Sequence, residues 1–365
     1  MAILSQRDLN DVRTRLTVWL QRHLPGATDL SVSELVVPQG TGMSSETMLF
    51  DATWRVGDVQ HGGPYVARLA PEMNDWPIFP SYDLALQARV MRLVREHTNV
   101  PVPDVPWIEL DASVVGSPFL VMERVGGVAP SDNPPYVFGG WLADGTTEQR
   151  RTLQDEAVRS LAKIHAIDIS AHDVTFLNRL QFGDTPLTQH LNELRAYFRW
   201  AAGDDSYPLV ERVAAWLEEN RPTSVGPVVI SWGDSRIGNM LFIDFRPTAV
   251  LDWEMACLGH AEIDLGWMAF MHRMFQLYAE VFELPGMPDF MRTTDMVATY
   301  EAASGRQLNA LRFYEVLAGY RMACIFLRTS PLSIKAGMMA EPATKEGYVT
   351  FSVLLEQMLD GSYWQ

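Results

Sequence analysis

The spacing of apolar and polar residues divides the chain into a strand-rich first part and a helical second part. Apolar residues recur at helical spacing over residues 9–24, and Pro25 and Gly26 end this predicted helix. Three runs with strand character then follow, separated by short glycine-containing segments, which favours an antiparallel sheet. These runs are residues 31–37, 47–56 and 65–70. A second helix is predicted over residues 84–97.

Residues 117–127 predict a buried strand that ends in glycines, and a linker follows it. Residues 126–145 contain five glycines and three prolines, with Tyr136, Phe138 and Trp141 between them. We expect these aromatic residues to hold the linker to the surface, and lining a substrate cleft is the alternative. Helical spacing dominates from residue 147 onward. The predicted helices are residues 156–169, 187–202, 207–220, 263–284, 289–305, 310–328 and 344–360.

Residues 228–267 interrupt the helical part with three short apolar runs of strand character. The runs are residues 228–231, 240–244 and 248–252. Gly233 breaks the first run and places Asp234 in the following loop, and the other two runs predict a hairpin. Asp234 and Asn239 precede the hairpin and Asp252 ends it, so their oxygen atoms can converge as hard ligands for Mg²⁺. The alternative is that all three are ordinary turn and capping residues.

Composition limits the partners of the chain. With 365 residues, 47% of them apolar, the chain can form two packed lobes. The formal net charge of −16 argues against nucleic acid or an anionic membrane as the main partner, and it permits a cationic small substrate. Cys257 and Cys324 are too few for a disulfide framework and predict reduced core thiols, hence a cytoplasmic location. No run of about 18 apolar residues predicts a membrane span.

The order of these elements resembles the aminoglycoside phosphotransferase and choline kinase-like enzymes, which are relatives of the protein kinases. The resemblance rests on the pattern G-D-x-x-x-x-N at residues 233–239, the strand-ending Asp252 and the D-L pair at residues 264–265. It implies an α+β, bilobal, protein kinase-like fold. Residues 1–125 would form a nucleotide-binding lobe with an antiparallel sheet, and residues 126–365 a mainly helical catalytic and substrate-binding lobe.

The resemblance also implies the reaction and its central residues. The chain would be a small-molecule kinase that moves the γ-phosphate of ATP, or of GTP, to a hydroxyl of an aminoglycoside-like compound, an amino alcohol or a sugar. Asp234 would be the catalytic base, Asn239 and Asp252 would hold Mg²⁺ on the nucleotide phosphates, and Asp264 would support the catalytic loop. The family has histidine where this chain has Trp232.

Nucleotide contacts are expected in the first lobe. In the loop at residues 39–45, Gly40, Gly42 and Ser44 would bring backbone amides to the phosphates, although a plain hairpin loop is the alternative. Arg68 stands where kinases place a phosphate-binding lysine, and an exposed strand arginine is the alternative. Gln87 best fits the position of the acidic partner that would hold Arg68; it can accept a hydrogen bond from Arg68 without neutralising it, and the alternative is that another residue holds this cation.

The segment around Glu123 and Val125 corresponds in the resemblance to the hinge between the lobes. Its backbone would pair with the adenine edge, and a plain core strand leading to a linker is the alternative. His165 is interpreted as a buried structural residue.

Two other function classes remain open. A metal-dependent phosphoesterase would also use a Gly-Asp pair followed by Gly-Asn, but such sites need several histidine ligands that this chain lacks beside Asp234 and Asn239. A catalytically weak, nucleotide-binding regulatory module is motivated by Trp232, Arg68 and Gln87, the replacements for the conventional histidine, lysine and glutamate. A base and two metal ligands together favour the enzyme.

Overall fold

The computed structural model describes residues 7–38, 45–71 and 76–365 of the chain. Within these ranges the fold divides into two compact units. The first unit comprises Met1–Arg95 and Val102–Val125, and the second comprises Glu96–Pro101 and Gly126–Gln365. Each unit has its own secondary structure and core, described in turn below.

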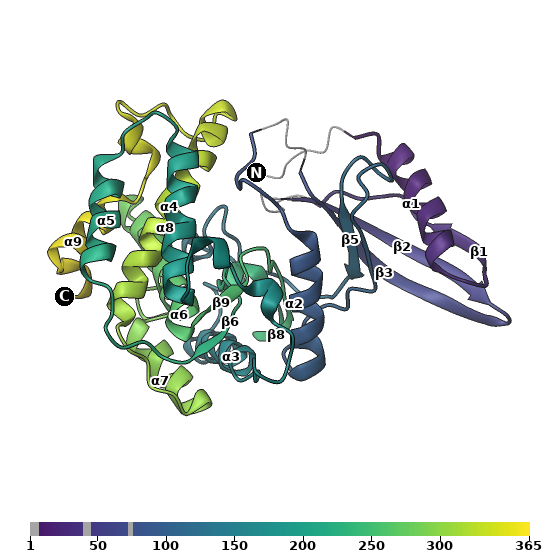
Figure 1. Ribbon diagram of the computed structural model, residues 1–365, viewed down its shortest axis with the longest axis horizontal. Coiled ribbons are helices and arrows are strands. Elements are labelled where there is room, and N and C mark those ends of the chain that lie inside the picture. The colour runs from purple at the N-terminus through teal and green to yellow at the C-terminus, as the bar shows by residue number, and fades with distance from the viewer. Residues whose placement is uncertain (1–6, 39–44, 72–75) are drawn as a thin grey trace. The chain divides into compact units, whose positions relative to one another are not determined.

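The first unit is built on a five-stranded antiparallel sheet with the order β1-β2-β3-β5-β4 (Figure 1). The strands are β1 Ala27–Val32, β2 Glu46–Val56, β3 Val59–Leu69, β4 Trp107–Glu109 and β5 Phe119–Glu123. Helix α1, Leu9–His23, begins where the Asp8 side chain accepts from the first backbone N–H groups. Its buried face, including Trp19, packs with Phe50 and Phe119 of the sheet. Helix α2 spans Leu84–His97.

Two strand predictions were wrong in their bounds. The first strand is Ala27–Val32 rather than residues 31–37, and β3 begins at Val59, so residues 61–64 lie inside a strand instead of separating two strands. Gly62 explains the second error. It has a φ of +132°, and a Cβ there would lie 2.1 Å from the carbonyl oxygen of Ala52. The glycine permits a close approach of β2 and β3, which sequence spacing alone presents as a loop signal.

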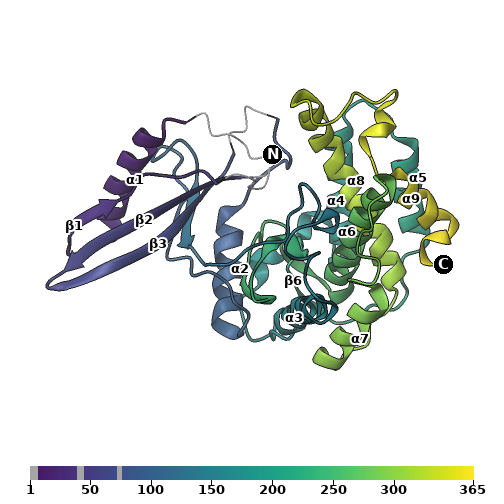
Figure 2. The same ribbon diagram turned by 180° about the vertical axis from the view of Figure 1, so that it is seen from behind.

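The second unit is mainly helical, with two small antiparallel sheets (Figure 2). The helices are α3 Thr147–His165, α4 Pro186–Ala202, α5 Pro208–Glu219, α6 Ala261–Val281, α7 Thr293–Ser304, α8 Leu311–Lys335 and α9 Ser352–Asp360. The sheets pair β6 Val228–Ser231 with β9 Cys257–His260, and β7 Met240–Ile243 with β8 Arg246–Val250. Short 3-10 helices are η1 Tyr136–Phe138, η2 Thr175–Leu177, η3 Leu180–Phe182, η4 Ile237–Asn239, η5 Lys345–Tyr348 and η6 Ser362–Trp364.

The core of the second unit lies around α6, whose residues are almost all buried, and α8 packs along it. The predicted hairpin is confirmed as β7 and β8, but its second strand is Arg246–Val250 rather than residues 248–252, so Asp252 lies just beyond the strand. Strand β9 was not predicted. Helix α8 continues to Lys335 through Pro331, beyond its predicted end at residue 328. None of the helices in the described part of the chain is long and apolar enough to cross a bilayer. A sheet-based first unit and a helical second unit confirm the α+β class.

Candidate active site

The candidate catalytic loop leaves strand β6 in a tight turn at Gly233. This residue has a φ of +90°, and a Cβ there would lie 2.2 Å from the carbonyl oxygen of Met255. The loop that carries Asp234 therefore runs against the segment that follows Asp252. Only glycine combines this backbone conformation with this close approach, so the sequence at Gly233 brings together two segments that the motif places far apart.

Asp234 is 8% exposed, and three side chains donate hydrogen bonds to its carboxylate. Trp267 Nε1 donates to Oδ1 at 2.7 Å, and Asn239 Nδ2 donates to Oδ2 at 2.7 Å. Arg236 Nε lies 3.1 Å from both oxygens. These donors come from α6, from the loop before β7 and from the catalytic loop itself. They fix the orientation of the carboxylate.

Arg236 is a cation held among carboxylates. Its Nη1 pairs with Asp132 Oδ2, and its Nε pairs with Asp234. Burial lowers the pKa of Arg236, but the charges of Asp132, Asp234 and Asp252 raise it by more, so the pKa lies above its ordinary value. The guanidinium is thus a permanent positive charge beside the candidate base, and the motif had not singled it out.

Asp264 accepts hydrogen bonds from the residues that precede Asp234 in the catalytic loop. Its fully buried carboxylate accepts from Ser231 Oγ and the Gly233 N–H at Oδ1, both at 2.9 Å, and from the Trp232 N–H at Oδ2, at 2.8 Å. His165 Nε2 lies 2.9 Å from Oδ2. Burial raises the pKa of Asp264, but His165 and the backbone N–H groups lower it by more, so the net pKa is below the usual value. Asp264 therefore holds the turn before Asp234.

His165 itself is a structural residue, as predicted from the sequence. It is 1% exposed, and its Nδ1 lies 2.9 Å from the hydroxyl of Tyr300 on α7. Both ring nitrogens are therefore used in contacts between α3, α6 and α7, with none directed at Asp234.

Asn239 and Asp252 come from the two sides of the β7–β8 hairpin. The Leu251 N–H donates to the Asn239 carbonyl oxygen at 2.9 Å, which joins the two sides directly before Asp252. Asn239 uses its Nδ2 to bond Asp234, so its amide oxygen is the atom left for a cation. An amide oxygen and a carboxylate fit Mg²⁺, which takes its remaining ligands from phosphate and water.

The same chemistry speaks against a dinuclear phosphoesterase. Over residues 7–38, 45–71 and 76–365, no three His, Cys, Asp or Glu side chains group so that they could hold a metal ion by themselves. Asn239 and Asp252 together offer two protein ligands, so a cation held there would need further ligands.

In the first unit, Arg68 is 9% exposed and its Nε donates to Ser45 Oγ at 2.7 Å. In the described part of the chain no hydrogen bond joins Arg68 to Gln87, which is buried on α2. The register accounts for the contact with Ser45, because Arg68 pairs across the strands with Thr47, two residues after Ser45. The predicted phosphate contacts Gly40, Gly42 and Ser44 lie outside the described residues.

The predicted hinge residues follow strand β5. The Glu123 N–H donates to the Asp104 carbonyl oxygen at 2.8 Å, so this donor is already used within the first unit. Within the described ranges, no hydrogen bond uses the backbone of Val125. The backbone of Val125 is therefore open to a ligand, while Glu123 offers its carbonyl oxygen.

The aromatic residues of the linker hold it to the second unit. Tyr136 is 4% exposed, and its hydroxyl lies 2.8 Å from His272 Nδ1 of α6. Trp141 packs its ring on Phe242 and Phe245 of the hairpin, with centroid distances of 6.2 and 5.3 Å. The structure thus agrees with the expectation that these residues pin the linker.

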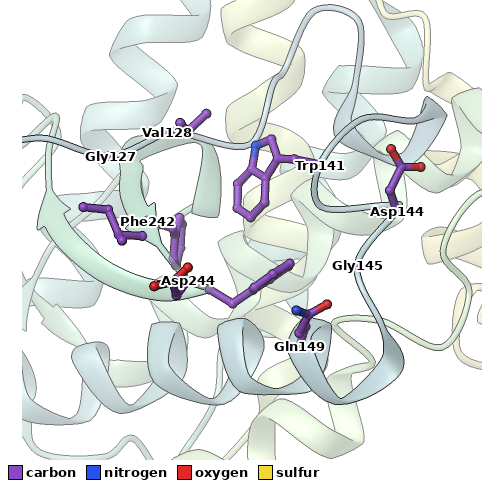
Figure 3. A pocket seen from close by; sticks show the side chains of 10 residues that line it. Gly127, Val128, Trp141, Asp144, Gly145, Gln149, Phe242 and Asp244 are labelled. Carbon is purple, nitrogen blue, oxygen red and sulfur yellow. The ribbon is translucent and has the colours of Figure 1, made fainter.

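Trp141 also lines an open cavity of about 710 Å³ in the second unit (Figure 3). The cavity lies between the linker, the start of α3 and the tip of the hairpin, and Asp144, Gln149 and Asp244 contribute polar atoms. Asp234, Asn239 and Asp252 are not among its lining residues. The cavity is therefore separate from the candidate catalytic site.

Comparisons with known proteins place this site in a family. The model of the phosphotransferase enzyme family, APH, matches residues 49–287. A candidate aminoglycoside phosphotransferase from Ralstonia eutropha has a TM-score of 0.63 at 22% identity, covering 94% of this chain and 96% of that one. The macrolide 2′-phosphotransferase MphH from Brachybacterium faecium has a TM-score of 0.53 at 17% identity, covering 93% and 97%. At these identities the likeness shows a shared fold.

Two curated relatives are much longer proteins. The Arabidopsis thaliana protein named probable acyl-CoA dehydrogenase IBR3 is 26% identical over 303 residues, which are 79% of this chain and 35% of that protein. Acyl-CoA dehydrogenase family member 11 of Gallus gallus is 25% identical over 320 residues, 84% of this chain and 38% of that protein. The chain spans about a third of the length of these relatives, so their names describe proteins with much additional sequence.

The family match covers well over half of the chain and includes the loop of Asp234, the β7–β8 hairpin and Asp264. This chain belongs to the phosphotransferase enzyme family.

Proposed function

We propose that the chain is an ATP- and Mg²⁺-dependent phosphotransferase that moves the γ-phosphate to a hydroxyl of a small molecule, with Asp234 as the catalytic base. The observation that carries this proposal is the arrangement around Asp234, a nine-tenths buried carboxylate fixed by three donors and adjacent to Asn239. Phosphoryl transfer needs positioning and charge neutralisation rather than covalent chemistry, and these residues supply both.

Asp234 would orient the acceptor hydroxyl and take its proton. A carboxylate offers about four acceptor positions, and Trp267, Asn239 and the two contacts of Arg236 use them. Arg236 is the donor that can exchange its partner, because its charge also complements a phosphate. We infer that the acceptor hydroxyl replaces Arg236 at the carboxylate and that Arg236 turns to the transferred phosphate.

Asn239 and Asp252 would hold Mg²⁺, which when bound neutralises charge on the nucleotide phosphates. Arg68 would contact the phosphates from the first unit, with Gly40, Gly42 and Ser44 supplying backbone donors. The backbone of Glu123 and Val125 would pair with the base of ATP or GTP. In this proposal residues 1–125 form the nucleotide-binding lobe and residues 126–365 the catalytic lobe, in the cytoplasm.

The test is an assay of MgATP consumption with a panel of hydroxyl compounds, comparing the wild type with Asp234→Asn and Asp252→Ala. We expect Asp234→Asn to lower kcat about 10²- to 10⁴-fold with MgATP affinity unchanged, because only proton transfer is lost. Asp252→Ala should remove the Mg²⁺ dependence of nucleotide binding. Asp244→Asn, on the hairpin turn and outside the catalytic site, is the matched control.

Unchanged turnover in Asp234→Asn would show that the base is another group. Binding of MgATP without turnover of any acceptor would favour the regulatory module instead. If MgATP neither binds nor raises Tm, the kinase hypothesis is wrong.

A further inference from the structure

Arg321 lies directly beside the candidate base. It is 2% exposed on helix α8, and its Nη2 donates to the carbonyl oxygen of Gly233 at 2.9 Å. Its guanidinium carbon lies 3.8 Å from the ring centroid of Trp267, the residue whose Nε1 donates to Asp234. Arg321 is therefore joined to Asp234 by two short routes, through the backbone and through the indole.

This guanidinium has donors that its neighbours do not use. Arginine carries five N–H donors, yet one hydrogen bond is formed, and Nε has no partner. In the ranges that the structure describes, no carboxylate forms an ion pair with Arg321. Burial lowers the pKa of Arg321 because a buried charge costs free energy, and the nearby charges of Asp234 and Asp264 raise it by less, so the net shift is downward. An anion would remove this cost.

The nearby carboxylates are already committed to other donors. Both oxygens of Asp264 and both oxygens of Asp234 accept two hydrogen bonds or close donor contacts each. Glu193 pairs with Arg179 at 3.3 Å. Among the described residues, Arg321 therefore has these carboxylates nearby as charges, but none of them forms an ion pair with it.

Two further titratable neighbours of Arg321 are uncharged. Burial, together with Arg321 and Arg179, lowers the pKa of His190 to about 3, so this ring is neutral. Burial raises the pKa of the Cys257 thiol to about 12, so it is not a thiolate at neutral pH. The negative charges near Arg321 are those of Asp234, Asp264 and Glu193, which are bonded to other donors, so the unpartnered Nε is a donor that an anion could use.

The same side of α8 carries a second contact of this kind. Arg328 lies 4.3 Å from the ring centroid of Trp200, seven residues or about 10 Å along the helix from Arg321. Arginine on an aromatic face presents a rigid planar fork that suits carboxylate and phosphate groups. Arg321 and Arg328 thus lie on the same side of α8, each packed on a tryptophan ring.

We propose that Arg321 binds an anionic group of the phosphate acceptor, so that the acceptor is a hydroxyl compound that also carries a carboxylate or a phosphate. The proposal rests on the proposed phosphoryl transfer and names its substrate class. The overall charge of the chain permitted a cationic acceptor, but the unpartnered Nε of Arg321 beside the base favours an anionic group. A charge-assisted, bidentate contact would place the anion about one indole length from the reacting hydroxyl.

The test uses sets of acceptors that differ only in charge. Each set contains a hydroxy acid, its primary amide and the amino alcohol of the same chain length, and a phosphorylated polyol with its parent polyol forms a separate arm. We expect the wild type to prefer the anionic member. Arg321→Gln should raise KM for that member about 10- to 100-fold. KM for the amide and for MgATP should not change, since neither meets this guanidinium.

Arg312→Gln is the matched control. Arg312 lies on the same helix with its guanidinium 5.1 Å from the Trp364 ring centroid, away from the catalytic site, and its loss should leave every KM unchanged. Arg321→Lys keeps the charge and should recover part of the affinity. If Arg321→Gln fails to fold, Arg321→Lys carries the comparison: a larger loss for the anionic member than for its amide is then expected.

Binding measured by calorimetry with a non-hydrolysable ATP analogue decides the matter even without turnover. Tighter binding of an anionic member than of its amide, lost in the Arg321 variant, is the expected result. Equal binding of both members, or an equal KM change for both, would show that Arg321 is structural and would overturn the proposal. Turnover of the neutral members of each set reports on phosphoryl transfer without the contact to Arg321, so the two proposals can fail separately.

Discussion

The substitution Asp264→Asn tests whether Asp264 holds the catalytic loop in place, because it replaces one carboxylate oxygen by an NH₂ group. Aspartate accepts two donors at each oxygen, and in each pair one donor is a backbone N–H. An asparagine keeps one oxygen and turns an NH₂ group toward the other pair. The Ser231 hydroxyl can rotate and His165 can change tautomer to accept from this NH₂, but a backbone N–H cannot.

The expected loss of stability follows from the number of donors that lose their acceptor. Whichever way the amide lies, the N–H of Trp232 or of Gly233 loses its acceptor in a fully buried position, which costs about 1–3 kcal/mol. The remaining bonds lose their charge assistance, which is partly offset because no charge is buried. We expect the free energy of unfolding to fall by about 3–5 kcal/mol, as for other buried pairs that lose one partner. Displacement of the turn should also lower kcat.

The assay is urea unfolding followed by tryptophan fluorescence, with Asp289→Asn as the control. The Asp289 side chain is 90% exposed, and its replacement should change stability by less than about 0.5 kcal/mol. A pH series adds a second readout. Because the folded pKa of Asp264 is depressed, its contribution is present above the unfolded pKa of about 3.9 and is lost as pH falls through the folded pKa.

The variant should therefore lose less stability than the wild type on acidification below that unfolded pKa. A loss below about 1 kcal/mol at pH 7, with normal kcat and an unchanged acid slope, would refute the view that Asp264 holds the loop.

Two further predictions concern the backbone and the thiols. Gly233→Ala would place a Cβ 2.2 Å from the Met255 carbonyl oxygen, so we expect the free energy of unfolding to fall by more than about 2 kcal/mol and turnover to be lost. In the control Gly305→Ala the added Cβ meets no atom within 4 Å, and the free energy of unfolding should fall by about 1–2 kcal/mol. Equal changes of Tm in the two variants would contradict the clash at Gly233. Burial raises the pKa of Cys257 to about 12 and that of Cys324 further. At pH 8 neither thiol should therefore react with an aromatic disulfide reagent until denaturant is added. Rapid reaction of the native protein would contradict their burial.

The sequence could locate the base and metal ligands because each stands at the end of a local apolar run. Asp234 follows β6, and Asn239 and Asp252 bracket the β7–β8 hairpin, so spacing alone indicated their approach. These relations depend on short segments whose period and turn residues are visible in the chain.

The surroundings of the base could not be predicted in this way. Trp267 is 33 positions from Asp234, and Arg321 is 88 positions from Gly233, so their contacts arise only when α6 and α8 pack. The hydrogen bond from Arg68 to Ser45 was likewise not predicted, since it depends on the register of β2 and β3. Such contacts depend on tertiary packing, which the local spacing of apolar residues does not predict.

Trp232 connects the loop of the base to the segment before Asp252 through a side chain that does not titrate. Its backbone N–H bonds Asp264, and its Nε1 donates to the Leu251 carbonyl oxygen at 2.8 Å, which ties the loop of the base to the segment that leads into Asp252. The family's usual histidine at this position would change its charge near pH 6.5. An indole does not titrate, so the link between base and metal ligand stays the same across the range in which a histidine would gain a proton.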